Sequence, residues 1–355
     1  MSTPLLENIL QQPEALAAVL LYQLGEGQEA LERAAQLLRS KKRIVLSGMG
    51  ASLFAVIPFQ YALAEHGFEV TAIETAELLY FLPSAIDRDT AVVLVSRSGE
   101  SVEVIKLLPR LRECGAAVVG VVNVPGAALS AGANQAVVVG SPADQLVAIQ
   151  TYTGTVAMFA LLGAVLFGEE AQARAEIEAT TEVLKRWVPE CLAASLEWRD
   201  FLSEASPLYV LGRGPALASV AEGVLLMHET AKAPAVGMSV AQFRHGPVEV
   251  VDRKFRAVVI GTQAITAELD RALAADLQKM GGEVRWIGPA AAAASWGRWP
   301  AEVPQRFAAI AEIVPLQMAA YRKAELNGIR PGDFRWAPLI TTSEAGFSLP
   351  GVQAN

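Results

Sequence analysis

The sequence predicts an α/β protein built from two similar parallel sheets, and three observations support this fold class. Short, continuously apolar runs alternate with stretches of helical length, as in parallel sheets that helices cover on both faces. The glycine pattern after the first strand, at Gly48 and Gly50, recurs as Gly212 and Gly214. The chain has 355 residues, 52% of them hydrophobic, which suffices for two domains with large cores.

The first half contains four expected strands separated by helical stretches. These strands are residues 44–46, 68–74, 91–96 and 116–123. A helical segment over 13–39 precedes them, and we expect it to break near Gly25 and Gly27. The most apolar stretch, 155–168, is shorter than the ~20 residues that a membrane span needs, so we expect a buried helix there.

The second half repeats landmarks of the first, which predicts a duplicated domain. The repeated stretches are 208–223, which echoes 44–56, and 257–263, which echoes 91–97. We expect a first unit over 1–170, a helical linker over 171–203 and a second unit over 204–355.

Composition and charge exclude several classes of function. The net charge is −8 without any Lys/Arg-rich block, so nucleic acid and anionic membranes are not expected partners. The N-terminus lacks the basic-then-apolar order of a signal peptide. Cys114 and Cys191 are far apart and form neither a disulfide framework nor a zinc pattern, so we expect reduced thiols in a cytoplasmic protein.

A serine-rich loop, "SRSGES", directly follows the third expected strand. Ligands of open α/β sheets bind at the carboxyl ends of strands, and a helix N-terminus favours phosphate. Ser96, Ser98 and Ser101 would supply hydroxyl groups, Gly99 would allow close approach, and Arg97 would add charge or point outward. Ser101 also has the position of an N-cap. The same pattern fits an ordinary capped turn.

A second glycine turn, "SGMGAS", has the same strand–turn–helix form. It places Gly50, Ala51 and Ser52 after the first strand. Leu53 occupies the third glycine position of the dinucleotide fingerprint, so we expect a smaller phosphate compound instead. In the helix after the serine loop, Pro109 predicts a kink or an early end.

Candidate acid–base groups lie in the second half. Residues 219–232 are predicted to be helical, and Glu222 and Glu229, seven apart, share a face among apolar neighbours. A carboxylate in such surroundings has a raised pKa, which suits a general base. The face could instead be solvated, or Glu229 could pair with Lys232.

Three histidines occur in the sequence. His245 lies in a Gly/Pro turn and is either a proton carrier or a turn residue bonded to backbone. We expect His66 to end a helix and His228 to be structural. None of these groups has a familiar metal-ligand spacing, so no metal is expected.

Taken together, the motifs resemble the tandem sugar isomerase (SIS) domain family over nearly the whole chain. "GMGAS", "VSRSGES", "HETAKA" and "AQFRHGPVEVVD" carry the resemblance. The chain is most similar to the isomerase half of glucosamine-6-phosphate synthase and to stand-alone aminosugar-phosphate isomerases and deaminases. The resemblance implies two tandem SIS domains, each a three-layer αβα, flavodoxin-like sandwich.

The resemblance also implies roles for individual residues. The phosphate of a hexose 6-phosphate would be held by Ser52, Ser96, Ser98 and Ser101, and Gly50, Ala51 and Arg97 complete the expected substrate contacts. Glu229 matches the glutamate that moves a proton between C1 and C2. His245 matches the histidine that opens the sugar ring and that the neighbouring subunit contributes, which implies a homodimer.

Several departures from the family pattern narrow the range of reactions that we expect the protein to catalyse. The resemblance does not extend to a glutaminase half, so we expect no release of ammonia from glutamine. Leu226 stands where the family has a lysine, and the family's C-terminal lysine has no counterpart near Pro338. Arg97 stands where glutamine is usual, and Ala51 where threonine is common.

We therefore expect conversion of glucosamine 6-phosphate to fructose 6-phosphate and ammonia, or the related aldose–ketose isomerisation, without a cofactor. A fructosamine-type sugar-6-phosphate deglycase and a non-catalytic sugar-phosphate sensor are the alternatives.

Overall fold

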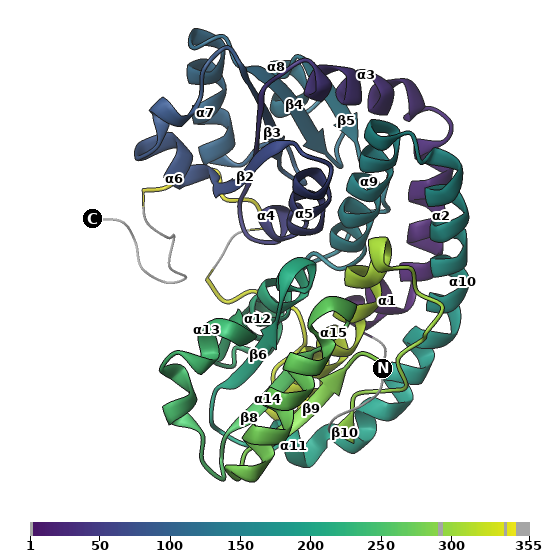
Figure 1. Cartoon of the computed structure of the whole chain (residues 1–355), viewed down its shortest axis with the longest axis vertical. Coiled ribbons are helices and arrows are strands. Elements are labelled where there is room, and N and C mark those ends of the chain that lie inside the picture. Colours follow the sequence, from purple (N-terminus) through teal and green to yellow (C-terminus); the bar gives the residue numbers. More distant parts are fainter. Residues whose placement is uncertain (1–2, 290–293, 337–338, 346–355) are drawn as a thin grey trace.

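The computed structural model describes residues 3–289, 294–336 and 339–345, and it contains two five-stranded parallel sheets. The first sheet has the order β2-β1-β3-β4-β5. Its strands are β1 (Arg43–Gly48), β2 (Glu69–Glu74), β3 (Thr90–Val95), β4 (Ala117–Val122) and β5 (Gln135–Val138). Together with its helices, this sheet forms the upper half of the molecule in Figure 1, here called the first lobe.

The second sheet belongs to the second lobe, the lower half of Figure 1. Its strands are β6 (Leu208–Gly212), β7 (Ala235–Ser239), β8 (Arg256–Ile260), β9 (Glu283–Ile287) and β10 (Ala294–Ser295). Read from β7, the order is β7-β6-β8-β9-β10, which is the order of the first sheet. The two sheets therefore share one topology, in agreement with the repeat seen in the sequence.

Helices cover the faces of both sheets. In the first lobe they are α2 (Gln12–Gln23), α3 (Gln28–Arg39), α4 (Ala51–Phe54), α5 (Ile57–Glu65), α6 (Thr75–Tyr80), α7 (Val102–Glu113), α8 (Ala128–Gly132) and α9 (Gln150–Phe167), whereas the first helix, α1 (Pro4–Leu10), packs against α15 in the lower half of Figure 1. The remainder are α10 (Glu170–Ala194), α11 (Arg199–Ser203), α12 (Leu217–Ala231), α13 (Val240–Arg244), α14 (Ala267–Lys279) and α15 (Ala308–Leu326). The expected break between α2 and α3 is confirmed, because helix stops at Gln23 and resumes at Gln28.

The strands form where the sequence is continuously apolar. All six residues of β3 are buried, as expected for a central parallel strand with helices on both faces. One hydrophobic cluster includes Val93 of the first sheet, Phe159 of α9, Val258 of the second sheet and Leu316 of α15. The two lobes are therefore joined by a continuous core.

Helix α9 has the length and apolar composition of a membrane span, with a mean hydropathy of 1.4 over 18 residues. In the structure, 78% of that window is buried inside the protein, and α9 packs against α2, α3 and α5. The position of α9 in the core accounts for its composition. The buried helix expected at 155–168 is confirmed and begins earlier, at Gln150.

The early helix end suggested for Pro109 was wrong, because α7 continues through this residue to Glu113, while the alternative, a kink, stays a prediction. Pro109 lies on the exposed side of the helix, so the carbonyl that loses its intrahelical hydrogen bond is near solvent.

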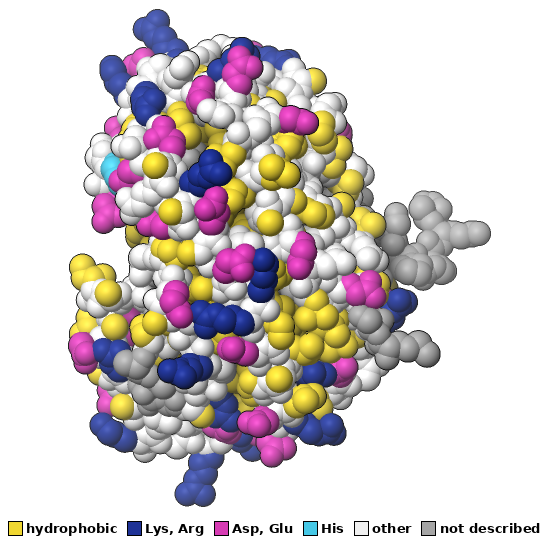
Figure 2. Space-filling view, turned by 90° about the vertical axis from the view of Figure 1, so that its right-hand side faces the viewer, with side chains coloured by type: hydrophobic (Ala, Val, Ile, Leu, Met, Phe, Trp, Pro, Cys, Tyr) yellow, Lys and Arg dark blue, Asp and Glu magenta, His cyan; other side chains and the backbone are white. Residues whose placement is uncertain are grey.

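On the face that carries α2 and α10, basic and acidic side chains are interspersed among apolar ones, as Figure 2 shows.

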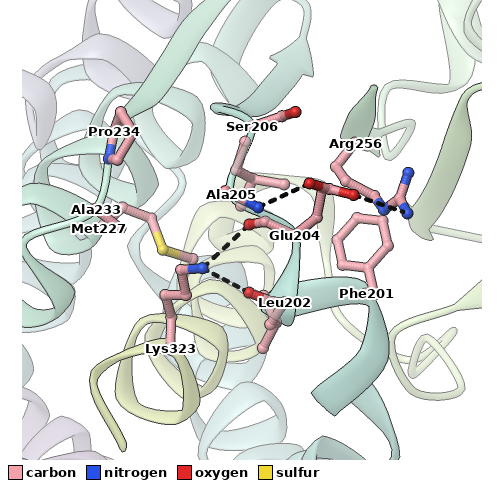
Figure 3. Close-up of a pocket in the computed structure, with 11 residues that line it drawn as sticks. Phe201, Leu202, Glu204, Ala205, Ser206, Met227, Ala233, Pro234, Arg256 and Lys323 are labelled. Atoms are coloured by element: carbon pink, nitrogen blue, oxygen red, sulfur yellow. Dashed lines mark hydrogen bonds and ion pairs between the residues drawn. The ribbon is translucent and has the colours of Figure 1, made fainter. Parts of the chain in front are cut away.

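Lys323 of α15 ties the linker segment to the second lobe (Figure 3). Its ammonium group donates to the carbonyl oxygens of Leu202, at 2.7 Å, and Glu204, at 3.2 Å, at the end of α11. Burial lowers the pKa of Lys323. The cavity beside this contact has a volume of about 30 Å³, which is enough for a water molecule and too small for a sugar phosphate.

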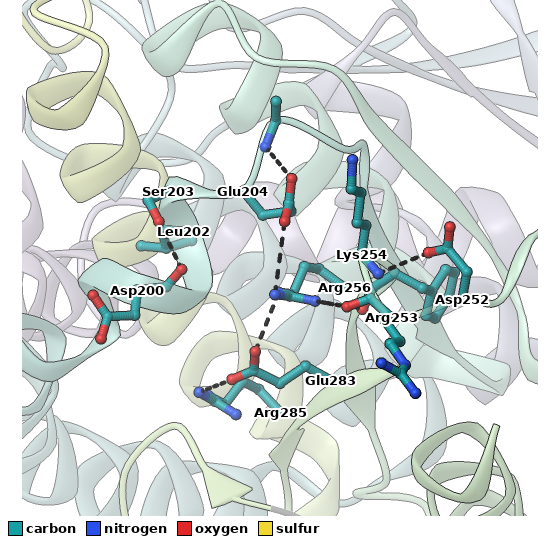
Figure 4. Close-up of polar contacts among 12 residues, drawn as sticks. Asp200, Leu202, Ser203, Glu204, Asp252, Arg253, Lys254, Arg256, Glu283 and Arg285 are labelled. Carbon is teal, nitrogen blue, oxygen red and sulfur yellow. Dashed lines mark hydrogen bonds and ion pairs between the residues drawn. The ribbon is translucent and has the colours of Figure 1, made fainter. Parts of the chain in front are cut away.

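Arg256 at the start of β8 holds the same segment from the other side (Figure 4). Its guanidinium lies 3.8 Å from the carboxylate of Glu204 and 3.2 Å from that of Glu283, which also pairs with Arg285 at 2.5 Å. These ion pairs join the end of α11 to β8 and β9. The chain between α11 and β6 is therefore attached to the second lobe by side chains from two elements, Lys323 of α15 and Arg256 of β8.

Candidate functional site

A cavity of about 300 Å³ opens between the two lobes, which is the lower end of the size range of small-molecule sites. It brings together five segments: the start of α4, the loop after β3, the region before and within α9, the end of α12, and the C-terminal segment. Its described lining residues are Met49, Gly50, Ala51, Ser52, Arg97, Ser98, Ser101, Glu103, Leu146, Val147, Ala148, Thr151, Tyr152, Thr155, Leu225, Glu229, Phe334, Leu339, Ile340 and Thr341.

The serine loop contributes Arg97, Ser98 and Ser101 to the cavity wall. Ser96 was expected to contact the ligand, but it is buried behind the loop and does not line the cavity. Its hydroxyl lies 3.0 Å from that of Ser101 and accepts the N–H of Gly99 at 3.1 Å. Ser96 therefore holds the shape of the loop in this structure, and its role as a direct phosphate ligand stays a prediction.

Gly99 is required by the loop for two reasons. Its φ is +72°, a left-handed conformation that L side chains rarely adopt. A Cβ at this position would lie 2.5 Å from the Cβ of Ala127, closer than two carbon atoms can approach. Only glycine lets the loop pack against the start of α8 and keep Ser98 and Ser101 at the cavity.

Helix α7 starts at the cavity, as expected, with Ser101 at its N-cap position. The Ser101 side chain makes no capping hydrogen bond and pairs with Ser96 instead. The first helical N–H, that of Val102, donates to the carbonyl of Thr341 at 3.0 Å. The C-terminal segment is thus attached directly to the end of α7 that faces the site.

Helix α4 presents Gly50, Ala51 and Ser52 to the cavity. Gly50 has a φ of +50° where β1 turns into α4, and a Cβ there would lie 3.6 Å from Leu225 of α12. Helices α4 and α12 are in contact, although they belong to different lobes. This packing places the predicted sugar-binding turn of the first lobe beside the predicted base of the second.

Glu229 lies in the last turn of α12 and lines the cavity. Burial raises its pKa from 4.5 to about 7, while the positive charges of Arg97 and Lys232 act in the opposite direction. The suggested Glu229–Lys232 side-chain pair does not form. The Lys232 ammonium donates instead to the backbone carbonyls of Glu229 and Asp333. The Glu229 carboxyl remains available to a ligand at the cavity.

Glu222, one heptad earlier on α12, does not line the cavity and is almost completely buried. Its two carboxyl oxygens have no hydrogen-bond partner within the described residues, and burial raises its pKa well above the usual value. Burial without a hydrogen-bond partner thus favours the protonated form of this carboxyl. Leu226, between the two glutamates, is buried as well, so the family's lysine position is apolar in this chain.

The histidines fall into two groups. His66 ends α5, as expected, and stacks on Phe167 with ring centroids 3.5 Å apart. His228 is structural, because its Nε2 accepts the N–H of Ala235 at 3.3 Å. His245 follows α13 and is exposed, and it lies outside the lining of the cavity in its own chain. One chain therefore brings together every predicted cavity residue except Ser96 and His245.

Sequence reasoning missed two parts of the site. Thr151, Tyr152 and Thr155 line the cavity from α9, a helix that the sequence indicated only as core. The residues 339–341 cover another side, and no local pattern in this segment without regular secondary structure predicts that position. Pro338, the expected counterpart of the family's C-terminal lysine, lies outside the described residues.

No cluster of three or more His, Cys, Asp or Glu side chains with metal-binding proximity occurs within residues 3–289, 294–336 and 339–345. Cys114 and Cys191 are both free thiols. The polar groups around the cavity are thus hydroxyls, carboxyls and one guanidinium. Such a set can bind a phosphate, form hydrogen bonds with sugar hydroxyls and transfer protons.

Comparison with known proteins relates the chain to sugar-phosphate enzymes. Residues 37–166 match the SIS domain family. The glutamine–fructose-6-phosphate aminotransferase (isomerizing) of Pyrococcus horikoshii is 27% identical over 336 residues, which are 92% of this chain and 55% of that protein. The corresponding Arabidopsis thaliana protein is 28% identical, over 91% of this chain and 51% of its own length. The chain spans about half the length of these curated relatives.

Solved structures with similar folds come from the same group. The C-terminal domain of glucosamine–fructose-6-phosphate aminotransferase from Francisella tularensis has a TM-score of 0.80 at 20% identity, over 92% of this chain and 97% of that one. The tagatose-6-phosphate ketose/aldose isomerase of Escherichia coli has a TM-score of 0.78 at 19% identity, with coverages of 93% and 95%.

Glucosamine-6-phosphate deaminase from Thermotoga maritima has a TM-score of 0.76 at 16% identity, over 95% of this chain and 99% of that one. At these identities the structures establish the fold, and the sequence matches establish common ancestry. Residues 37–166 thus match the SIS domain family, and over most of its length the chain is similar in sequence to about half of the glutamine–fructose-6-phosphate aminotransferases and shares the fold of the C-terminal domain of one such enzyme.

Proposed function

We propose that the protein is a phosphosugar isomerase or deaminase that acts on an aminosugar 6-phosphate. For glucosamine 6-phosphate, the products would be fructose 6-phosphate and ammonia. The observation that carries this proposal is the single cavity that holds both the serine loop and Glu229, whose pKa of about 7 suits a proton shuttle at neutral pH. SIS-domain ancestry and the fold of known phosphosugar enzymes support the substrate class.

The arrangement supports a simple division of roles. Ser52, Ser98 and Ser101 bind the phosphate at the start of α4 and α7, where hydroxyl groups and helix amides favour an anion. Glu229 removes the proton from C2 of the open-chain aldose and returns a proton to C1. The resulting C2 imine reacts with water to give the ketose and ammonia. Binding of the distant phosphate positions C1 and C2 at Glu229 and so accelerates the proton transfer.

We assign ring opening to His245 of a second subunit in a homodimer. Two features support this assignment. His245 is exposed and absent from the cavity of its own chain. An open apolar depression, formed by residues such as Phe54 and Ile57 of the first lobe and Val220 and Val224 of the second, lies beside the edge strands β2 and β7. A second copy that covers this depression would bury apolar surface next to α13, the helix that His245 follows.

The domain arrangement and location remain part of the proposal. Equal strand order in the two sheets supports a second SIS domain over 204–355, after the first over 1–170 and the linker over 171–203. The low number of cysteines and the sugar-phosphate substrate support a cytoplasmic location.

The decisive assay is incubation with glucosamine 6-phosphate, with ammonia and fructose 6-phosphate measured separately. Equal amounts of both products support the deaminase. Conversion of fructose 6-phosphate to its aldose, without release or uptake of ammonia, supports isomerase activity alone. Absence of turnover with tight binding of the sugar phosphate would instead favour a non-catalytic sensor and contradict the enzymatic proposal.

The origin of His245 can be tested by mixing two inactive variants, Glu229→Gln and His245→Ala. If His245 acts in the partner's site, each mixed dimer has one intact site, and random mixing restores about a quarter of the wild-type activity. If His245 acts within its own chain, every site in the mixture has one defect and activity stays lost.

A second candidate, a deglycase that splits a sugar 6-phosphate from an amino acid, is favoured by Leu226. The side chain at the family's lysine position is apolar and buried, and none of the described cavity residues is a lysine. The described cavity residues therefore offer no lysine amine that could form a Schiff base with the sugar. Release of free amino acid from a fructosyl-amino acid 6-phosphate, faster than ammonia release from glucosamine 6-phosphate, would identify this activity.

A further inference from the structure

Arg97 is the one Lys, Arg or His side chain among the described residues that line the cavity. Two carboxyl groups, those of Glu103 and Glu229, line the same space, and the buried Glu222 lies close enough for its pKa to be affected by both Glu229 and Arg97. A bound sugar phosphate would add further negative charge. The described lining of the cavity therefore contains a single cationic side chain among several acidic groups.

The guanidinium of Arg97 retains donors for a ligand. Its Nη1 donates to the carbonyl of Leu146 at 3.4 Å, which is a long hydrogen bond, and no ion pair of Arg97 occurs within the described part of the chain. The backbone of Arg97 is fixed, because the N–H of Asn123 donates to its carbonyl at 2.9 Å. A guanidinium has five N–H donors, so most of them remain free.

The hydrogen bond of the Arg97 side chain leads away from the serine loop to another segment of the cavity lining. Leu146, its partner, belongs to the segment that precedes α9 and also lines the cavity. The positive charge also reaches Glu229, where it favours the ionised carboxylate against the larger effect of burial. Ser52, Ser98 and Ser101 already supply hydroxyl donors at the phosphate end. Arg97 is thus placed towards the reacting carbons.

We propose that Arg97 stabilises the oxyanion that forms on O1 when Glu229 removes the C2 proton of the bound sugar phosphate. This inference rests on the proposed function. In the step, the C2–H electron pair forms the C1=C2 double bond, the π pair of the C1 carbonyl moves onto O1, and the proton goes to Glu229. Glu229 then protonates C1, and O1 receives the proton that leaves the substituent on C2. The charge appears on O1 whether C2 carries a hydroxyl or an amino group.

Arg97 would act as the electrophile. Leu226, at the position that the resemblance assigns to a lysine, is apolar and cannot take this role. A preorganised charged donor is worth about 10²–10³ in turnover for one oxyanion contact. Arg97→Gln should therefore lower kcat by that factor with little change in KM. Arg97→Lys, which keeps the charge and loses the fork geometry, should recover part of the loss.

Two five-carbon ligands distinguish the oxyanion role from a phosphate contact. Arabinonate 5-phosphate carries a carboxylate where the enediolate oxygens would lie, whereas arabinitol 5-phosphate has the same phosphate and a neutral end. We expect Arg97→Gln to weaken arabinonate 5-phosphate about 10- to 100-fold, as for loss of a charge-assisted hydrogen bond, and to leave arabinitol 5-phosphate within about twofold. Retained arabinitol 5-phosphate binding also shows that the variant is folded.

Arg112→Gln is the matched control, since it removes an exposed guanidinium from α7 outside the cavity and should change neither affinity. Equal weakening of both ligands by Arg97→Gln would assign Arg97 to the phosphate and overturn the proposal. Unchanged binding of both ligands would also overturn it. If the wild-type protein binds neither compound, the proposed function itself fails, and the role of Arg97 fails with it.

Discussion

Replacement of Glu229 by glutamine tests the proposed proton shuttle most directly. Glutamine has nearly the same shape, fits the last turn of α12 and cannot take up a proton. The Lys232 contact to the Glu229 backbone carbonyl does not involve the side chain, so it persists in the variant. We expect kcat to fall by about 10²–10⁴, the range for loss of a positioned general base, while sugar-phosphate affinity stays close to that of the wild type.

The same carboxyl predicts a pH dependence and a stability change. Because its pKa is raised from 4.5 to about 7, Glu229 is about one tenth ionised at pH 6 and about nine tenths ionised at pH 8, so turnover should rise with pH through neutrality. The folded state binds the proton more tightly than the unfolded chain does. The contribution of Glu229 to the free energy of unfolding is therefore fully present below pH 4.5. It is lost as pH rises through about 7, by at most about 3 kcal/mol.

Glu229→Gln removes this loss, so the variant should be more stable than the wild type at pH 8 and equally stable at pH 4. The assay combines steady-state kinetics from pH 5.5 to 8.5 with thermal unfolding at both pH values. A rate that does not change over this range, or a kcat equal to that of the wild type, would refute the assignment of Glu229 as the base. A destabilised variant at pH 8 would refute the burial argument for its pKa.

Three further substitutions have defined outcomes. Ser98→Ala combined with Ser101→Ala should raise KM for the sugar phosphate by roughly tenfold or more, as measured by initial rates, and unchanged KM would contradict phosphate binding at this loop. Gly99→Ala should destabilise the fold by about 1–3 kcal/mol in urea unfolding, because of its positive φ and the contact with Ala127. Lys323→Met should cost about 1–3 kcal/mol by leaving the Leu202 and Glu204 carbonyls unpaired, and an unaltered unfolding midpoint would show that water replaces the ammonium group.

Local sequence patterns were sufficient for the elements whose side chains are uniformly buried. The continuous apolar run of β3 and the glycine break before α3 both agree with the structure. Patterns were insufficient where burial comes from distant chain segments. β5 pairs with β4 through a short stretch of mixed burial, which no period-2 or apolar signal distinguishes from a loop. Helix α7 tolerates Pro109 because of its exposed side, which depends on the neighbouring elements.

The candidate site shows the same division. Ser98, Ser101 and Glu229 were identifiable because loops at strand ends and carboxyls among apolar residues have local signatures. The distinction between Ser96 and Ser101 had no such signature, since it depends on which hydroxyl faces inward. Local sequence also does not distinguish Glu229, which lines the cavity, from Glu222, which is buried one heptad earlier on the same helix.

By itself, the sequence determined the two parallel sheets, their common glycine turns and the types of group available for chemistry, because periodicity and residue type are local properties. Only the tertiary structure decided which of those groups share a cavity. Contact between α4 and α12, which lie in different lobes, brings the glycine turn at residues 50–52 close to the helix of Glu229, and burial raises the pKa of that carboxyl. Distances across such a contact depend on the packing of the whole core, and no short stretch of sequence encodes them.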